Sequence, residues 1–480
     1  MPTLFQLALA INYSAAIWMV FAVLRRRGEP GAMLAWIFAL LTLPGLGPFL
    51  YVVFGETRVY RKASRLRRRR LDLINRVKRW AERQFDTSAA ELIGGLPPEL
   101  QAIDRLGRDL LHAPPVGGNY VEFLGESDKT FAAIENAIAS ASRHIHMQYY
   151  IWQPDQTGYQ FRELLIQKAR AGIECRLLLD SVGSLRLNRR FTAPMIEAGV
   201  QVAFFLPLWH RRRRISLHLR NHRKVTVIDG RDALMGSLNI GDEYRGRLRS
   251  LSPWYDSNIR IRGPATLFLQ QTFLEDWTFA TREYLDPDRY LVGPTREGES
   301  IIQILPTGPD QPTPVLTHVL AAAVAAAKSS IRIAMAYFVP DPGIMLALEH
   351  AAIRGVLVQI ILPTRTDAAA TLWAGRSYYP ELLHAGVEIY EFDAGMLHSK
   401  MVTIDDKWCM LGSANMDARS FRLNFELTAL VYDPSMTQSV SAMIEHHRAR
   451  ARRISLFEVH NRPIVHQWIE GVARMMSPLL

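Results

Sequence analysis

An 18-residue motif occurs twice in the chain and limits the available folds more than any other feature. Residues 222–239 are HRKVTVIDGRDALMGSLN, and residues 398–415 are HSKMVTIDDKWCMLGSAN. Both copies contain His-x-Lys, four residues, Asp, six residues and Gly-Ser-x-Asn, and they begin 176 residues apart. A repeat period of this length indicates a duplicated domain, because solenoid repeats are several times shorter.

The sequences that precede the two motifs also correspond, and they predict an α/β fold. Residues 131–155 and 316–341 each predict an Ala-rich helix, an alternating strand and a Pro-Asp pair. A helix closed by a glycine, Gly172 or Gly355, and a buried strand follow in both copies. Alternation of helices with apolar strands is typical of layered α/β domains. We therefore expect two tandem α/β sandwich repeats that pack face to face.

The N-terminus contains two long apolar segments. Residues 4–24 and 31–55 carry no charged side chain, and a membrane-spanning helix needs about 20 apolar residues. A signal peptide is a weak alternative, because no basic residue precedes the first segment and its apolar run is too long. The sequence Pro44-Gly45-Leu46-Gly47-Pro48 must kink the second segment or make it re-entrant. A short connection makes the two segments a membrane hairpin.

A basic block follows this hairpin. Residues 58–83 hold twelve Lys and Arg against Asp72 and Glu82, nearly the whole net charge of +11. Eight basic residues fall within 56–75 and three in the connection between the apolar segments, which predicts that the rest of the chain is cytoplasmic. Beside an anionic leaflet the block would bind lipid rather than nucleic acid, or it could be a solvated helix. Arg211–Arg214 could likewise bind phosphate or form a solvated loop.

The chain of 480 residues is long enough for two or three compact units. Its C-terminal tail is predicted to be helical, and it could contact the membrane surface or pack on the core. The predicted division is a transmembrane hairpin at 1–55, a basic segment and linker at 56–118, the first repeat at 119–283, a linker at 284–300, the second repeat at 301–450 and the tail at 451–480.

The repeated motif carries side chains suited to phosphate chemistry. Side chains two apart on a strand share a face, so His222 projects with Lys224, and His398 with Lys400. Two histidines supply a nucleophile and an acid/base group near neutral pH, while lysines and asparagines donate to an anionic phosphate. One phosphodiester needs attack on one side and leaving-group protonation on the other, which explains the duplication. The expected phosphate-binding side chains after the turns are Ser237, Asn239, Ser413 and Asn415.

Four carboxylates accompany the motifs. Asp256 and Glu426 are candidates for fixing the tautomer of a histidine, and they lie 34 and 28 residues beyond the histidines of their own motifs. Asp229 and Asp405 complete the motif and are counted with the catalytic set, although their position at strand ends favours turn capping or core pairing. No cluster supplies the ligands of a catalytic metal, and two cysteines, Cys175 and Cys409, exclude a disulfide framework.

The two motifs resemble the signature of the phospholipase D superfamily. EPGAMLAWIFALLTLPGLGPFLYVVFGE, RNHRKVTVIDG, NIGDEY, YFVPD, HSKMVTIDD and the terminal SPLL are similar to sequences of the bacterial cardiolipin synthases, including their two-helix membrane anchor. The resemblance covers nearly the whole chain and implies two phospholipase D-like repeats. Gly-Ser at 236–237, where many relatives have Gly-Gly, and the Arg211–Arg214 insert depart from the family pattern. These departures concern substrate detail and leave the reaction type unchanged.

The resemblance implies phosphatidyl transfer without metal or cofactor in a bacterial inner membrane. His222 would attack the phosphate of a phosphatidylglycerol, and His398 would protonate the departing glycerol. His398 would then deprotonate a second phosphatidylglycerol, whose attack on the phosphatidyl-histidine gives cardiolipin. The two lysines and two asparagines would bind the phosphate, with the serines as secondary supports. Anionic membrane lipid is the implied partner, and nucleic acid is not.

Several alternatives stay open at the level of sequence. Hydrolysis by a phospholipase D shares the covalent step, and phosphatidylethanolamine could replace phosphatidylglycerol as the phosphatidyl donor. The order in which the two histidines act cannot be read from the residues. A nuclease and a membrane-anchored lipid-binding scaffold are less favoured, because two apolar segments precede the motifs and both motifs are intact.

Overall fold

The computed structural model describes residues 4–25, 30–54, 75, 76, 79, 96, 98–207, 219–248, 252–293, 295–311 and 313–477. Most of the basic block at 58–83, the Arg211–Arg214 insert and the end of the SPLL sequence lie outside the described residues. The chain divides into two compact units, residues 1–66 and 67–480.

The described residues of the N-terminal unit form the helices α1 (Leu4–Leu24), α2 (Pro30–Thr42) and α3 (Leu46–Phe54). The second apolar segment is broken between α2 and α3, as its Pro-Gly sequence predicts; Gly45 has φ +74° and its amide donates to Asn12 Oδ1 at 2.8 Å. At a rise of about 1.5 Å per residue, α2 is roughly 20 Å long, shorter than the apolar thickness of a bilayer. Among the described residues, no helix combines the length and apolarity of a membrane span.

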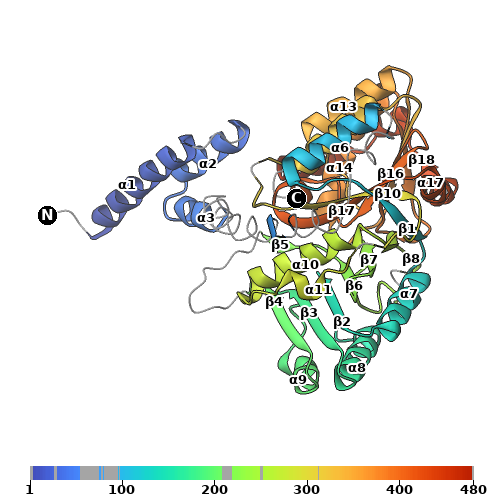
Figure 1. Ribbon diagram of the computed structural model, residues 1–480. Helices are drawn as coiled ribbons and strands as arrows, with labels where there is room; N and C mark the ends of the chain where they lie inside the picture. The colour runs from blue at the N-terminus through green and yellow to red at the C-terminus, as the bar shows by residue number, and fades with distance from the viewer. Residues whose placement is uncertain are drawn as a thin grey trace. The chain divides into compact units, whose positions relative to one another are not determined.

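The larger unit contains two half-sheets with the same strand order (Figure 1). The first half-sheet, in spatial order, is β1 (Val116–Leu124), β9 (Asn258–Arg262), β7 (Asp232–Gly236), β6 (Val225–Ile228), β2 (His144–Tyr149), β3 (Glu174–Asp180) and β4 (Gln201–Phe205). The second is β10 (Ser300–Thr307), β17 (Asn424–Tyr432), β16 (Trp408–Gly412), β15 (Lys400–Ile404), β11 (Ser330–Met335), β12 (Leu357–Pro363) and β13 (Glu388–Phe392), extended by β18 (Ala451–Arg453). Antiparallel pairing of β1 with β10 joins the halves into one continuous sheet.

Helices cover both faces of each half-sheet. The first half carries α7 (Ser127–Ser140), α8 (Gln156–Arg170) and α9 (Arg189–Glu197) on one face and α10 (Thr266–Thr281) on the other, and α11 (Pro287–Tyr290) follows α10. The second half carries α12 (Val315–Ala326), α13 (Pro342–Ile353), α14 (Ala369–Arg376) and α15 (Tyr379–His384) on one face and α17 (Pro434–Ala449) on the other. The Pro-Asp pairs of the two repeats cap α8 and α13, because Asp155 and Asp341 accept from backbone amides.

The two half-sheets share a hydrophobic core. One buried cluster contains Val227, Met235 and Ile261 of the first half together with Leu411 and Ala429 of the second. Alternate residues of a strand point to opposite faces, so these side chains form the facing surfaces of the two sheets. This is the face-to-face packing of two α/β repeats that the duplicated sequence predicts.

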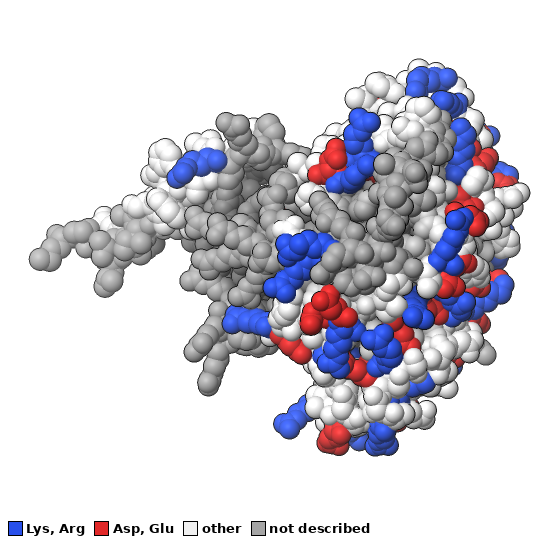
Figure 2. Space-filling model, viewed as in Figure 1, with Lys and Arg blue, Asp and Glu red and all other residues white. Residues whose placement is uncertain are grey.

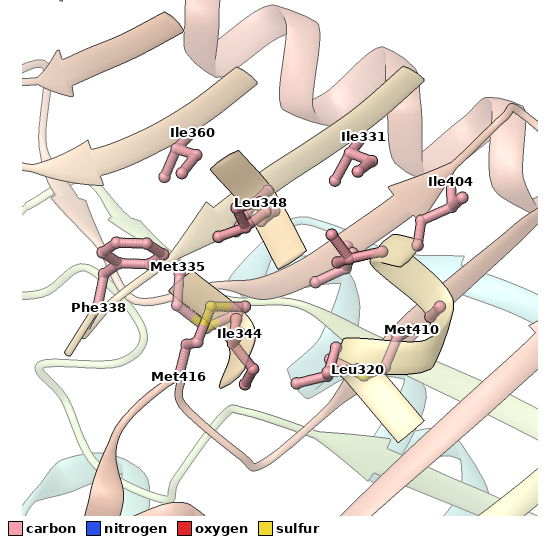
Figure 3. Close-up of a cluster of buried hydrophobic side chains, with 14 of the residues drawn as sticks. Leu320, Ile331, Met335, Phe338, Ile344, Leu348, Ile360, Ile404, Met410 and Met416 are labelled. Carbon is pink, nitrogen blue, oxygen red and sulfur yellow. The ribbon is translucent and has the colours of Figure 1, made fainter. Parts of the chain in front are cut away.

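A second cluster lies between the sheet of the second half and its outer helices (Figure 3). Leu320 of α12 and Leu348 of α13 contact this cluster from the helix side, and Ile331 and Ile360 come from the strands. Met416, which follows Asn415 of the second motif, is also buried here. The core therefore anchors the loop that carries Gly-Ser-x-Asn.

The structure differs from the predicted division at two places. Helix α6 (Pro98–Leu111) lies in the predicted linker but packs on α12 and β10 of the second half. The predicted tail begins with β18, which pairs with β13, and continues as α18 (Leu456–His460) and α19 (Ile464–Met475). On the face of the larger unit that Figure 2 shows, acidic and basic side chains of the described residues are interspersed, so these residues form no basic stripe there.

Candidate active site

Short strands bring the two motifs together by pairing across the halves. β5 (Arg220–Asn221), directly before His222, pairs with the start of β17. β14 (Met396–Leu397), directly before His398, pairs with β8 (Trp254–Tyr255) in the same way. The backbone amides of His222 and His398 donate to the carbonyls of Phe425 and Tyr255 at 2.9 and 2.8 Å. Each histidine is thus fixed to a strand of the opposite half.

The two histidines and the two predicted carboxylates also pair across the halves. His222 Nδ1 lies 3.0 Å from Glu426 Oε2, and His398 Nδ1 lies 2.8 Å from Asp256 Oδ1. Both carboxylate side chains are fully buried. Because an ionised carboxylate only accepts hydrogen bonds, Nδ1 of each histidine carries the proton and Nε2 is the ring nitrogen left for chemistry.

The serines of the Gly-Ser-x-Asn segments hold these carboxylates. Ser237 Oγ donates to Asp256 Oδ1 and Ser413 Oγ donates to Glu426 Oε2, both at 2.5 Å. The preceding glycine permits this approach, because a Cβ at Gly236 would lie 2.4 Å from the carbonyl oxygen of Ser257. Both serines are completely buried, so their hydroxyls contact carboxylates within the protein. From the sequence, these serines were instead expected to bind the phosphate.

The two lysines lie against the histidines. Lys224 Nζ donates to the carbonyl of His222 and Lys400 Nζ to that of His398, each at 2.7 Å. Lys400 Nζ is also 3.2 Å from His398 Nε2. Burial lowers the pKa of both lysines, that of Lys400 to about 8 and that of Lys224 well below its usual value. The carboxylates of Glu426 and Asp256 oppose the change at both lysines, and the charge of Lys400 adds to it at Lys224. Two buried lysines beside the motif histidines are suited to bind an anion.

Both histidines have lowered pKa values. Burial lowers the pKa of His222 to about 4; Glu426 opposes this change, and the charges of Lys224 and Lys400 add to it. Burial and the charge of Lys400 also lower the pKa of His398, and the carboxylates of Asp256 and Asp367 oppose this change. His222 is linked through Glu426 to Ser413 of the second motif, and His398 is linked through Asp256 to Ser237 of the first. These contacts bring both motifs to one site.

The predicted asparagines border this site and are buried. Asn239 Oδ1 accepts from the amide of Ile151 at 3.1 Å, whereas Asn415 Oδ1 has no hydrogen-bond partner among the described residues. The residue after Asn415, Met416, donates to the carbonyl of Tyr337 at 3.2 Å, and this fixes the loop. Phosphate binding by the asparagines stays a prediction.

Asp229 and Asp405 lie at the opposite end of the strands from the histidines. Asp229 accepts from the backbone amides of Ser142, Arg143 and His144 at 2.8 Å. Asp405 accepts in the same manner from Lys328, Ser329 and Ser330. These contacts are the turn capping that the strand-end positions indicate. Neither carboxylate contacts a motif histidine, so their place in the catalytic set is not supported.

Three residues near the histidines were not predicted from the sequence. The ring of Tyr150 lies 4.9 Å from that of His222, and Lys224 Nζ lies over the same tyrosine at 5.3 Å. Tyr337, whose ring is 6.4 Å from His398, donates to Asp367. These residues lie in the loops after β2, β11 and β12. Their position just after these strands was the only sequence feature that could have identified them. Tyr150 and Tyr337 do not occupy equivalent positions in the repeats, so the two sides of the site differ.

The described residues contain no group of three or more His, Cys, Asp or Glu side chains that could hold a metal ion. The donor set is instead imidazole, ammonium, amide and hydroxyl. That the reaction needs no metal or cofactor stays a prediction.

A duplicated α/β fold with one His-Lys pair from each half in a shared site defines the phospholipase D class. The family described as "Cardiolipin synthase, PLD-like domain" matches residues 134–277 and 320–448, and the family "Phospholipase_D-nuclease N-terminal" matches residues 14–56. The chain belongs to the cardiolipin synthase family.

Similar proteins agree with this assignment. The chain is 36% identical over 485 residues to the cardiolipin synthase of Geobacillus thermodenitrificans, with 97% of this chain and 92% of the relative covered. It is 35% identical over 459 residues to cardiolipin synthase 2 of Bacillus anthracis, with 94% and 87% covered. The crystal structure of phosphatidylserine synthase from Haemophilus influenzae has the same fold, with a TM-score of 0.60 at 16% identity over 79% of this chain and 100% of that chain.

Proposed function

We propose that the protein transfers a phosphatidyl group from one phosphatidylglycerol to another and releases glycerol, which makes cardiolipin. The observation that carries this proposal is the shared site, in which two buried histidines are each held by a carboxylate of the opposite half. A site with two nucleophile-capable rings and two buried ammonium groups suits attack and departure on one phosphodiester.

In the first step, His222 Nε2 attacks phosphorus while the bond between phosphorus and the glycerol oxygen breaks. His398, in its protonated form, gives the proton of Nε2 to that oxygen. Glu426 accepts from His222 Nδ1–H and stabilises the positive charge that the ring gains as the phosphorus–nitrogen bond forms. Lys224 and Lys400 stabilise the negative charge on the phosphoryl oxygens.

In the second step, His398 Nε2 takes the proton from a glycerol hydroxyl of a second phosphatidylglycerol. The hydroxyl oxygen attacks phosphorus, the bond to His222 breaks, and cardiolipin is formed. Water in place of this hydroxyl would give phosphatidic acid, so exclusion of water decides between transfer and hydrolysis.

The protonation of the two histidines bears on this division of roles. A nucleophile must be unprotonated, and the low pKa of His222 keeps its ring neutral at physiological pH. A general acid must hold a proton, whereas burial and Lys400 lower the pKa of His398 against the opposing effect of Asp256 and Asp367. An anionic phosphate between the motifs would raise the pKa of His398 and so favour the protonated form that the first step needs.

We further propose that Ser237 and Ser413 are positioning residues. Each hydroxyl donates its hydrogen bond to the carboxylate that holds the histidine of the opposite half. The lysines and the asparagines are then the groups that contact the phosphate.

The same proposal includes a bacterial inner membrane with the larger unit on its cytoplasmic side. Its support is the charge-free sequence of the first 24 residues, the match of residues 14–56 to a family-specific N-terminal domain and the basic block after it. Anionic lipid is the expected partner of that block.

A single assay tests the reaction. The purified full-length protein is mixed with phosphatidylglycerol and a chelator in detergent micelles, and the products are separated. We expect cardiolipin and glycerol in equal amounts. Phosphatidic acid as the main product would mean hydrolysis. Release of ethanolamine, when phosphatidylethanolamine is added, would mean that this lipid is a donor, and absence of any turnover would contradict the proposal.

A further inference from the structure

The C-terminal helix α19 presents an apolar face that no described part of the chain covers. Along this helix, apolar side chains recur at the spacing of one helical face, and most are more than half exposed. The exposed fractions are 56% for Ile464, 55% for Val465, 67% for Trp468, 61% for Val472 and 82% for Met475. Contiguous apolar patches of this kind on a folded protein mark an interaction surface.

The opposite side of α19 is fixed to the protein. Arg474 forms a two-pronged ion pair with Glu381 at 3.0 and 3.1 Å and stacks over the ring of Tyr378 at 4.4 Å. Glu470, the only acidic residue of α19, is 7% exposed and pairs with Arg462 at 2.7 Å. These contacts hold the polar side of the helix against the protein, and its exposed apolar face carries no acidic side chain.

A hollow of about 370 Å³ lies between α19 and α14 and is lined by apolar side chains alone. Ala370 and Trp373 contribute from α14, and Trp468 and Val472 from α19. The hollow and the exposed face of α19 form one surface, which we call the α14–α19 face.

The loop that leads into α14 adjoins the active site. α14 follows β12, and Asp367 in the connecting loop accepts from Tyr337, whose ring lies 6.4 Å from His398. Ala370 comes three residues after Asp367, a span of at most about 10 Å. Arg365, in the same loop, is exposed, so this loop carries a cation at the protein surface.

We propose that the α14–α19 face inserts into the lipid leaflet from which the active site draws its substrates. The tryptophans, the helix with one apolar face and the exposed arginine at its margin are the features of an interfacial membrane-binding helix. A second copy of the chain would bury apolar surface equally well but would not use the arginine beside the site. The inference rests on the proposed function, because it explains how a phospholipid head group enters while its acyl chains stay in an apolar medium.

A fluorescent label on α19 tests this proposal independently of catalysis. The full chain with Val472→Cys is labelled with an environment-sensitive dye and reconstituted in vesicles of phosphatidylcholine and phosphatidylglycerol; the native cysteines are 1% and 0% exposed. The matched control is Ile353→Cys, at the C-terminal end of α13, where the side chain is 70% exposed. We expect a blue shift at position 472, and loss of emission when the acyl chains carry bromine, with neither at position 353.

Equal emission at the two positions, or a blue shift at 472 that brominated lipid does not quench, would overturn the proposal; the second result would indicate a protein partner. In a parallel measurement, Trp468→Asp is expected to raise KM for phosphatidylglycerol in vesicles and to leave kcat unchanged. Because the label reports insertion whether or not cardiolipin is made, failure of the proposed function and failure of this inference give different results.

Discussion

At the scale of single residues, the chemistry of the site depends on which side chains are protonated. His222 and His398 are neutral imidazoles in the resting site because burial disfavours their charged forms. Lys400 is different, since its lowered pKa of about 8 lies just above physiological pH. The sequence predicts the identity of these residues from the motif spacing. Their proton affinities depend on burial and on charges from the opposite half, which the spacing does not contain.

The pH dependence of kcat/KM is expected to have a basic limb near pH 8. Loss of the proton from Lys400 removes positive charge from the site, so activity falls as pH rises through its pKa. In Lys400→Arg the limb disappears, because a guanidinium stays protonated, although kcat falls since arginine differs in shape. An exposed control, Lys407→Arg, keeps the limb. Persistence of the same limb in Lys400→Arg would show that another group titrates.

Ser237→Ala and Ser413→Ala are each expected to lower kcat about 10- to 100-fold with little change in KM, because each removes a hydrogen bond to a buried carboxylate worth about 1.5–3 kcal/mol. Asn239→Ala, in contrast, is expected to raise KM. Steady-state kinetics on micelles of phosphatidylglycerol separate the two effects. A serine variant that changes only KM would indicate that the serines bind the phosphate.

At the scale of elements, the alternation of helix and strand and the Pro-Asp caps were predictable, because each depends on local sequence. Helix α6 was missed because Pro and Gly around it resemble a linker, and its packing on α12 comes from a distant part of the chain. The break between α2 and α3 was predicted, since proline cannot donate within a helix. Asp229 and Asp405 belong to this scale, because they tie the ends of β6 and β15 to the starts of β2 and β11.

Asp229→Asn is expected to reduce stability by about 1–3 kcal/mol, because a charged acceptor of several amides is lost, while kcat per folded chain stays within about twofold. Burial opposes ionisation of Asp229, but donated hydrogen bonds lower its pKa overall. Its contribution is therefore present above the unfolded-state pKa of about 4 and is lost as pH falls through the lower folded-state value. Thermal unfolding at pH 7 and pH 3 checks this. Complete loss of activity in a fully folded Asp229→Asn protein would restore a catalytic role.

At the scale of the whole molecule, the site depends on contacts between the halves, because each carboxylate holds the histidine of the opposite half. Asp256 and Glu426 were predicted to orient histidines, but periodicity along one chain cannot tell which histidine each one reaches. The pairing of β5 with β17 and of β8 with β14 settles it, since these strands carry each carboxylate to the opposite motif. Neither half contains a histidine with its carboxylate, which accounts for two intact copies of the motif.

This crossed pairing predicts that variants group across the halves. Asp256→Asn is expected to behave like a His398 variant, and Glu426→Gln like a His222 variant, with kcat lowered at least tenfold in each. Rapid-mixing kinetics that separate formation from breakdown of the phosphatidyl-enzyme distinguish the groups. If Asp256→Asn instead slowed formation in the manner of a His222 variant, the crossed assignment would be wrong.

The most direct test of the central claim uses a phosphatidyl donor with p-nitrophenol as its leaving group, which departs without protonation. His398→Ala should then release a rapid burst of one p-nitrophenol per chain and stop, because His222 still forms the phosphorus–nitrogen bond but no base activates the second lipid. His222→Ala should give no burst. A burst from His222→Ala, or none from His398→Ala under conditions where the unmodified protein turns over, would contradict the account.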